Sequence, residues 1–134
     1  MCAILGVLNS NIDNNLFKEM LDIMNNRGKD STGYYFSKNV SLGHKRLAIR
    51  DLKNGSQPMF FKNYIIVYNG EVYNSEEIKN DLLNKGYTFS TTSDTEVILK
   101  GYAEYKKKIL NKLEGIFAFA IYNKKIRPEF NGEV

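Results

Sequence analysis

The apolar residues of this chain change their spacing along the sequence, and that change is the strongest constraint on its fold. Some segments are continuous or alternating apolar runs typical of strands, whereas others repeat apolar residues at helical spacing. The strand-like segments are residues 3–8, 33–36, 40–49, 64–69 with a continuation over 71–73, and 115–122. They do not alternate with helices in the regular way that repeated βαβ units require. We therefore predict a single domain of the α+β class.

Three helices are expected between these strands. Apolar residues recur one turn apart over residues 13–26. A second helix is expected to begin after Asn74, with Asn74 as N-cap and Glu77 at the third position, and to end at Gly86. The capping-box sequence 93–96 predicts a third helix to about residue 105, followed by a helical turn or two over 109–113.

Two further local features carry structural predictions. Residues 115–122 read GIFAFAIY, and a strand of this composition is expected to be buried on both faces. The pair Asn69-Gly70 is the strongest short hairpin signal in the chain, which predicts that the backbone turns or bulges there.

Length and composition exclude several classes of protein. The 134 residues, of which 43% are hydrophobic and 25% charged, are typical of one globular domain. The net charge is +4, but apart from Lys106-Lys107-Lys108 the basic residues are scattered, which argues against a nucleic-acid surface. No basic segment precedes the N-terminal apolar run, and no segment reaches membrane-spanning length. The chain is therefore expected to be cytoplasmic, with neither nucleic acid nor a membrane as a partner.

Cys2 is the only cysteine, which excludes an internal disulfide and a zinc site built on paired cysteines. If Met1 is removed, Cys2 carries both a thiol and a free α-amine. An α-amine has a pKa near 8, so it can accept the proton of the thiol and later deliver it to a leaving group. With Met1 attached, that nitrogen is an amide and the base is missing. Taken alone, Cys2 is more simply a small apolar residue that begins a buried strand.

Cys2 belongs to a series of seven short segments. In order, these are Cys2-Ala3-Ile4-Leu5-Gly6, Arg27-Gly28-Lys29-Asp30-Ser31-Thr32-Gly33, Leu42-Gly43-His44-Lys45-Arg46-Leu47-Ala48-Ile49, Gln57-Pro58-Met59, Tyr68-Asn69-Gly70-Glu71-Val72-Tyr73-Asn74, Ser93-Asp94-Thr95-Glu96-Val97 and Gly115-Ile116-Phe117-Ala118-Phe119-Ala120. Together they resemble the glutaminase domain of class II, or N-terminal nucleophile (Ntn), glutamine amidotransferases. Within that class they are most similar to the glutamine-hydrolysing asparagine synthetases.

This resemblance implies a fold and a domain boundary. The fold would be an Ntn-hydrolase-type four-layer αββα sandwich of antiparallel sheets, expected to be incomplete at the C-terminus. Residues 1–123 would be the N-terminal part of the glutaminase (type 2 glutamine amidotransferase) domain, whereas the tail 124–134 matches none of its later strands. Missing strands would leave sheet edges able to pair with another chain, and a homo-oligomer is left open.

The resemblance also implies the catalytic and substrate-binding residues. Cys2 would attack the side-chain amide of glutamine, while Asn69 and Gly70 donate hydrogen bonds to the oxyanion of the tetrahedral intermediate. No metal site is implied. The substrate-binding residues would be Arg46 for the α-carboxylate, Asp94 for the α-ammonium, and Asn69 and Glu71.

Some of these residues have a simpler interpretation when taken alone. Asp94 would stabilise the first turn of a helix through the helix dipole. Asn69-Gly70 would be an ordinary turn. His44, the only histidine, is expected to pack or to form a hydrogen bond rather than to catalyse, since the N-terminal amine already supplies a base. Arg27-Gly28 and Asp30 are expected to shape a loop that closes over the substrate.

The function implied is that of the glutaminase domain of an asparagine synthetase-like enzyme. Glutamine would be hydrolysed to glutamate and ammonia through a Cys2 thioester, and the ammonia would pass to a synthetase domain or chain outside these residues. The glutaminase reaction would need no cofactor, and ATP and Mg²⁺ would belong to the synthetase domain. The alternative is a truncated, non-catalytic remnant that binds glutamine or has a regulatory role.

Overall fold

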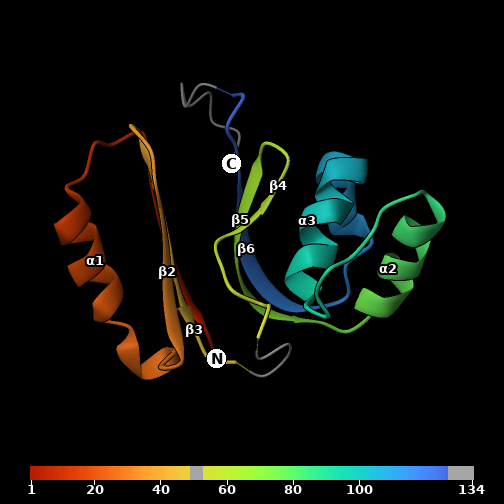
Figure 1. Cartoon of the computed structure of the whole chain (residues 1–134), viewed down its shortest axis with the longest axis horizontal. Helices are drawn as coiled ribbons and strands as arrows, with labels where there is room; N and C mark the ends of the chain where they lie inside the picture. Colours follow the sequence, from red (N-terminus) through yellow and green to blue (C-terminus); the bar gives the residue numbers. More distant parts are fainter. Residues whose placement is uncertain (49–52, 127–134) are drawn as a thin grey trace.

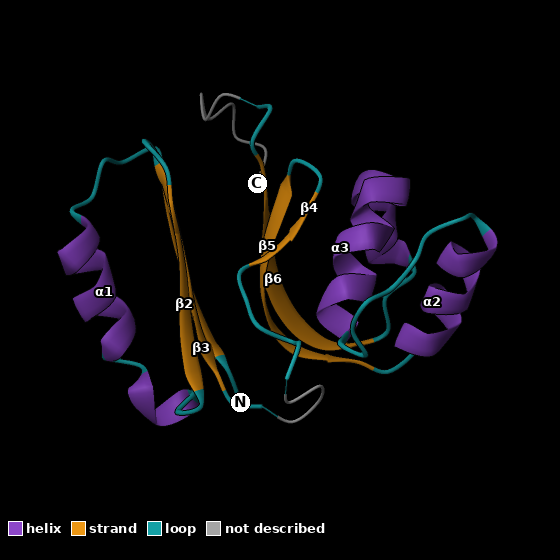
Figure 2. Ribbon diagram, in the orientation of Figure 1, coloured by secondary structure: helices purple, strands orange, loops and turns teal. Residues whose placement is uncertain are grey.

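Four layers of secondary structure make up the computed structural model, which describes residues 1–48 and 53–126 (Figure 1). Helix α1 (Asn14–Asp22) covers one antiparallel sheet, and helices α2 (Ser75–Asn84) and α3 (Asp94–Tyr105) cover a second one (Figure 2). The strands, in their order across the two sheets, are β1 (Ala3–Leu8), β3 (Val40–Arg46) and β2 (Ser31–Phe36), and then β4 (Met59–Phe61), β5 (Tyr64–Val72) and β6 (Gly115–Asn123). The predicted α+β class and the αββα sandwich of antiparallel sheets are confirmed.

Helix α1 packs on the outer face of the first sheet through a short apolar stripe. Phe17 and Leu21, one turn apart, are both fully buried. Gly43 of β3 lies beneath them, because a Cβ atom there would come within 2.8 Å of both side chains. The helix ends at Asp22, earlier than predicted, and a short 3-10 helix, η1 (Asn25–Arg27), follows it.

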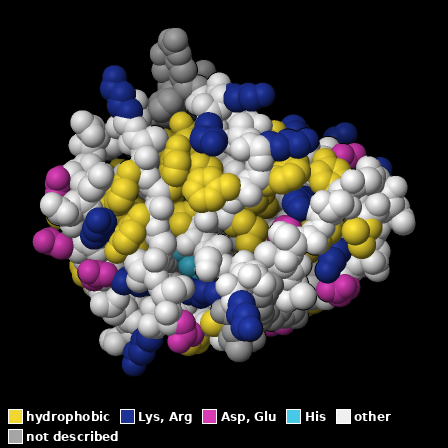
Figure 3. All heavy atoms as spheres, in the orientation of Figure 1, with side chains coloured by type: hydrophobic (Ala, Val, Ile, Leu, Met, Phe, Trp, Pro, Cys, Tyr) yellow, Lys and Arg dark blue, Asp and Glu magenta, His cyan; other side chains and the backbone are white. Residues whose placement is uncertain are grey.

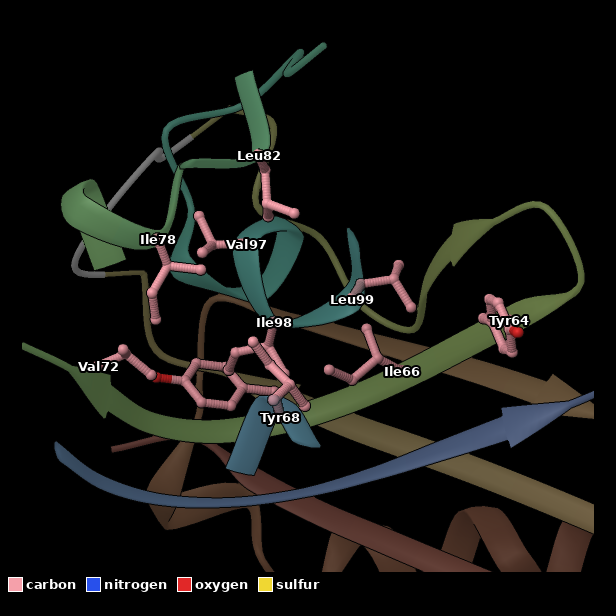
Figure 4. Close-up of a cluster of buried hydrophobic side chains, with 10 residues drawn as sticks. Tyr64, Ile66, Tyr68, Val72, Ile78, Leu82, Val97, Ile98 and Leu99 are labelled. Atoms are coloured by element: carbon pink, nitrogen blue, oxygen red, sulfur yellow. The ribbon is translucent and has the colours of Figure 1, made fainter. Parts of the chain in front are cut away.

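Strand β5 is buried on both faces because its alternate residues contribute to two separate cores. The smaller core lies between the sheets and contains Ile65 and Val67 of β5 together with Val40 and Leu42 of β3. Each buried side chain of this size contributes about 1.5–3 kcal/mol relative to an exposed one. The larger core lies between the second sheet and helices α2 and α3 (Figure 4), and its buried members are Tyr64, Ile66, Tyr68, Val72, Ile78, Leu82, Val97, Ile98, Leu99 and Ile109.

The prediction that the last strand is buried on both faces is wrong. Strand β6 pairs with β5 on one side, and within residues 1–48 and 53–126 no strand pairs with its other edge. Its side chains are covered only in part, and Ile116 is 75% exposed. Hydrophobic side chains reach the surface over the two sheets, with Lys and Arg side chains dispersed around them (Figure 3). An apolar sequence shows that a strand is hydrophobic, but only its neighbours in the fold determine whether its side chains are buried.

The predicted turn at Asn69-Gly70 is also absent. Strand β5 runs through this pair and keeps an unbroken register with β6, in which Asn69 lies opposite Ala118 and Gly70 opposite Phe117. Gly70 has a φ angle of +145°, and a Cβ atom there would lie 2.3 Å from the Ile116 carbonyl oxygen. The glycine therefore allows two strands to approach closely rather than forming a turn.

Asn74 is at the predicted N-cap position of α2 but forms no capping hydrogen bond through its side chain. Its amide nitrogen donates to the Lys112 carbonyl at 2.7 Å, and its amide oxygen accepts from the Glu114 N–H at 3.0 Å. These bonds join the start of α2 to the segment just before β6. The end of the helix is as predicted, because α2 stops at Asn84 and Gly86 follows with a φ angle of +94°.

Helix α3 has its predicted cap but only half of the predicted capping box. Ser93 accepts from the Thr95 N–H at 3.1 Å. Glu96 accepts from the N–H groups of Ser90 and Thr91 instead, both at 2.9 Å. Burial alone would raise the pKa of Glu96, but these hydrogen bonds outweigh it and hold that pKa below its usual value. The carboxylate thus fixes the loop in front of α3.

Of the remaining elements, one was predicted, one was not, and one strand is shorter than predicted. The helical turns expected after α3 are present as a 3-10 helix, η2 (Lys106–Asn111). Strand β4 was not predicted, because three residues are too few for a recognisable alternation. The strand predicted over 40–49 ends at Arg46, and Ile49 lies outside the described residues. None of the helices in the described part of the chain combines the length and the hydrophobicity needed to cross a membrane.

Candidate active site

A cavity of about 450 Å³ opens at one end of the sandwich. Its volume lies in the range of sites that hold small molecules. Residues that precede β1, end β3, lie in β5 and β6 and begin α3 line it. All six residues predicted for the site are among them: Cys2, Arg46, Asn69, Gly70, Glu71 and Asp94.

The strand register explains why Cys2 and Arg46 meet at this cavity. Ala3 of β1 pairs with Lys45 of β3, so the residues one step beyond lie side by side at the same end of the first sheet. Lys45 points outward and forms an ion pair with α1 at 2.6 Å. Since side chains alternate along a strand, His44 and Arg46 point the other way, toward the second sheet.

The thiol of Cys2 is held by the backbone just after β3. Its Sγ accepts from the Leu47 N–H at 3.3 Å and lies 3.5 Å from the Leu47 carbonyl oxygen, to which it donates. The Nε of Arg27 donates to the Cys2 carbonyl at 3.4 Å. Cys2 is half-buried, so the thiol has a fixed place at the cavity while part of the residue stays accessible.

The loop predicted to close over the substrate supports this backbone. A Cβ atom at Gly28 would lie 2.5 Å from the Lys45 carbonyl, so only glycine allows the loop to pass so close to β3. Asp30 donates through its N–H to the Arg46 carbonyl at 2.9 Å, and its carboxylate accepts from the Ala48 N–H at 2.7 Å. The loop therefore holds residues 46–48 in place next to the thiol.

His44 is buried and links the two sheets. Its Nε2 lies 3.1 Å from the Tyr68 carbonyl oxygen, which accepts a hydrogen bond, so the proton of the neutral ring is on Nε2. The pKa of His44 is lowered from its ordinary 6.5 to about 4, chiefly by burial and to a smaller extent by the nearby Arg46 guanidinium, against the raising effect of the hydrogen bond. His44 is therefore neutral at physiological pH. The predicted hydrogen-bonding histidine is present.

Asp94 combines a place at the cavity with a structural role. It is the first residue of α3 and is 7% exposed. Its Oδ2 accepts from the Tyr68 hydroxyl at 2.6 Å and from the Val72 N–H at 3.0 Å. The carboxylate thus joins α3 to β5 and also lines the cavity.

Sequence reasoning assigned no role to Tyr68 or Gln57, although both belong to the quoted segments. The side-chain oxygen of Gln57 accepts from the Tyr68 N–H at 2.6 Å, and its amide nitrogen donates to the Thr95 hydroxyl at 3.2 Å. Gln57 is 9% exposed, so its amide needs these partners, and no local sequence pattern signals them. These contacts connect the middle of β5 to the start of α3.

Asn69 and Glu71 lie on the face of β5 that looks toward the first sheet. They continue the alternation of Ile65 and Val67, which pack between the sheets. Asn69 is partly exposed and Glu71 exposed, so both polar side chains border open space at this end of the strand. The amide of Asn69 supplies both a donor and an acceptor to the cavity.

The cavity therefore presents a thiol, an amide, a cation and an anion within one small volume. A guanidinium and a carboxylate together suit a zwitterionic ligand such as a free amino acid. No cluster of three or more His, Cys, Asp or Glu side chains that could hold a metal ion occurs within residues 1–48 and 53–126.

Known proteins with similar sequences indicate which family this chain belongs to. The family model described as glutamine amidotransferase domain matches residues 1–130. The chain is 43% identical over 132 residues to asparagine synthetase [glutamine-hydrolyzing] 1 of Bacillus subtilis, with 92% of this chain and 21% of that protein covered. It is 40% identical over 129 residues to asparagine synthetase B [glutamine-hydrolyzing] of Escherichia coli, with 92% of this chain and 23% of that protein covered. The chain thus spans about a fifth of the length of these curated relatives.

Solved structures agree with the sequence comparisons. Glutamine phosphoribosylpyrophosphate amidotransferase from B. subtilis, complexed with ADP and GMP, superimposes with a TM-score of 0.58 at 28% identity, covering 66% of this chain and 22% of that one. The allosteric regulatory enzyme of purine biosynthesis gives a TM-score of 0.57 with the same identity and coverage. The predicted Ntn-hydrolase fold is confirmed by these neighbours. From its sequence match, its sandwich fold and the residues around its cavity, the chain belongs to the glutamine amidotransferase domain family.

Proposed function

We propose that this chain is the glutaminase domain of an asparagine synthetase-like enzyme and hydrolyses glutamine to glutamate and ammonia. The observation that carries the proposal is the convergence of Cys2, Arg46, Asn69, Gly70 and Asp94 on one cavity. Free glutamine is a zwitterion with a side-chain amide, and these groups complement each of its parts. The names of the curated relatives, which describe glutamine-hydrolysing enzymes, point the same way.

Ground-state binding would use the two charged side chains. The planar guanidinium of Arg46 suits bidentate pairing with the α-carboxylate of the substrate. Asp94 would accept from the α-ammonium, and Glu71 at the open side of the cavity would add a further polar contact. With both charges held, the side-chain amide of glutamine lies toward Cys2.

The chemical step would begin at the Cys2 sulfur. The α-amine of Cys2 takes the thiol proton as the sulfur attacks the amide carbon, and the amide oxygen becomes an oxyanion. Asn69 through its side-chain amide and Gly70 through its N–H would stabilise that charge. Removal of one such donor typically costs 10²–10³ in rate, or about 3–4 kcal/mol. The intermediate expels ammonia, which takes the stored proton, and water then hydrolyses the thioester to glutamate and the free thiol.

This mechanism requires removal of Met1. In the structure Met1 lies at the cavity and its peptide bond occupies the nitrogen of Cys2, so the base becomes available only after that bond is cleaved. A small penultimate residue permits such processing. The chain with Met1 attached would be a precursor without glutaminase activity.

The ammonia acceptor is part of the proposal. We place it in a synthetase domain or chain beyond these residues, since the named relatives are synthetases. In that domain ATP and Mg²⁺ would activate a carboxylate. The glutaminase half needs neither of them.

The proposal is tested by measuring glutamate release from glutamine, after intact mass has established that Met1 is absent. Cys2→Ala is expected to abolish turnover, and only the wild-type chain should form a covalent adduct with a glutamine-like diazoketone. Asp94→Asn is expected to raise the KM for glutamine, whereas Asp22→Asn, which removes an acid on the outer face of the first sheet, should leave it unchanged.

Two results would contradict the proposal. The first is full activity of the Cys2→Ala variant, and the second is retention of Met1 in a chain that turns over glutamine. Calorimetric binding of glutamine without turnover by the Met1-free chain would select the non-catalytic alternative.

A further inference from the structure

Tyr68 forms more of the hydrogen bonds that organise the cavity than sequence reasoning indicated. Its N–H donates to Gln57 at 2.6 Å, its carbonyl accepts from His44 at 3.1 Å, and its hydroxyl donates to Asp94 at 2.6 Å. The residue is 3% exposed and immediately precedes Asn69. Its backbone and its side chain are therefore held by three different segments of the chain.

The hydroxyl of Tyr68 and the Val72 N–H both bind the same oxygen of Asp94. They donate to Oδ2 at 2.6 and 3.0 Å, and no donor of the described residues bonds to Oδ1. Two donors on one oxygen restrain the orientation of the carboxylate. The oxygen left over is available to a cation that enters the cavity, which Asp94 lines.

We propose that Tyr68 is the positioning residue of an ammonium subsite formed by Asp94. Its hydroxyl holds the carboxylate so that Oδ1 accepts from the α-ammonium of an amino-acid substrate. Because the backbone of Tyr68 leads directly into Asn69-Gly70, the same residue fixes the distance between this subsite and the segment next to the reacting amide. The inference deepens the proposed function and rests on it.

A purely structural role for Tyr68 makes a different prediction. Its ring belongs to the larger core, so a residue needed only for packing would affect every substrate equally. A residue that orients the ammonium subsite should affect only substrates that carry an ammonium group. L-Glutamine and 4-carbamoylbutanoate form the required pair, because they share the carboxylate and the amide and differ only in the α-ammonium.

The experiment compares the Tyr68→Phe variant with the wild-type chain on both substrates. The phenylalanine keeps the ring and removes the hydroxyl. Loss of a hydrogen bond to a charged group should lower kcat/KM for glutamine about tenfold or more. The value for 4-carbamoylbutanoate should change less than about twofold, since that substrate makes no use of the oriented oxygen.

A matched control removes a similar hydrogen bond away from the cavity. The Tyr105 hydroxyl donates to Asp81, which joins α3 to α2, and Tyr105→Phe should leave both substrates unaffected. A double variant provides a second readout, because Tyr68→Phe should have no further effect on glutamine once Asp94→Asn has been introduced. Thermal unfolding of each variant checks that the fold is intact.

Three results would overturn the inference. These are an equal loss with both substrates, no loss with glutamine, and fully additive effects of Tyr68→Phe and Asp94→Asn. If the wild-type chain turns over neither substrate, the proposed catalysis fails, and the same pair is compared as calorimetric dissociation constants. A tenfold weakening confined to glutamine would then support the inference on its own, whereas absence of glutamine binding would refute it.

Discussion

Replacement of His44 by glutamine should remove a defined part of the acid sensitivity of this protein. The histidine is 1% exposed and donates from Nε2 to the Tyr68 carbonyl. In His44→Gln the amide nitrogen can occupy the place of Nε2 and keep the hydrogen bond. The variant therefore differs from the wild type mainly in having no group that can take up a proton at this position.

The size of this loss of stability at low pH follows from the pKa of His44. Burial, aided by Arg46, lowers the pKa from 6.5 to about 4 in the folded chain. Between these pH values the unfolded chain binds the proton and the folded chain does not, so stability is lost as the pH falls. At pH values well above 6.5 the ring is neutral in both states, so the histidine does not destabilise the fold there. At about 1.4 kcal/mol per pH unit, the loss reaches about 3 kcal/mol by pH 4.

The assay is urea unfolding at several pH values between 7.5 and 4, followed by far-UV circular dichroism because the chain has no tryptophan. Carboxylates titrate in both proteins, so their contribution cancels when the two free energies of unfolding are subtracted. The free energy of unfolding of His44→Gln, relative to that of the wild type, should rise by about 3 kcal/mol as the pH falls. Parallel curves for the two proteins would show that the histidine is not kept neutral by burial.

Two other substitutions probe the packing that supports the site. Ile98→Ala should lower the free energy of unfolding by about 2–5 kcal/mol in a urea titration, because Ile98 is fully buried in the larger core; a loss below 1 kcal/mol would mean that the core is loosely packed. Gly33→Ala should lower the melting temperature and the glutaminase activity together, because a Cβ atom there would lie 1.8 Å from the Gln57 carbonyl oxygen. Unchanged melting and activity would show that the segment carrying Gln57 is free to move.

Local sequence patterns predicted most of the elements and many of their ends. The first strand occupies residues 3–8 as predicted, and α3 ends at Tyr105 as predicted. The end of α2 before Gly86 was also predicted correctly. These features depend on contacts within a few residues, namely apolar spacing, a side-chain cap and a glycine with positive φ, so the local sequence carries the information.

The candidate site was predicted as a set of residues but not as a network. The order of short segments identified Cys2, Arg46 and Asp94, which the structure places around one cavity. The hydrogen bonds of Tyr68 and Gln57 could not be predicted in the same way. They join residues that are distant in sequence, and their partners depend on how β5 packs against α3.

The sequence by itself determined the α+β class, the approximate elements and six of the residues that line the cavity. Only the tertiary structure decided that β6 is partly exposed, that Gly70 lies within a continuous strand, and that His44 is buried and neutral. The physical reason is the same in each case. Exposure, close approach of strands and protonation depend on neighbours supplied by distant segments, and no local pattern records which segments those are.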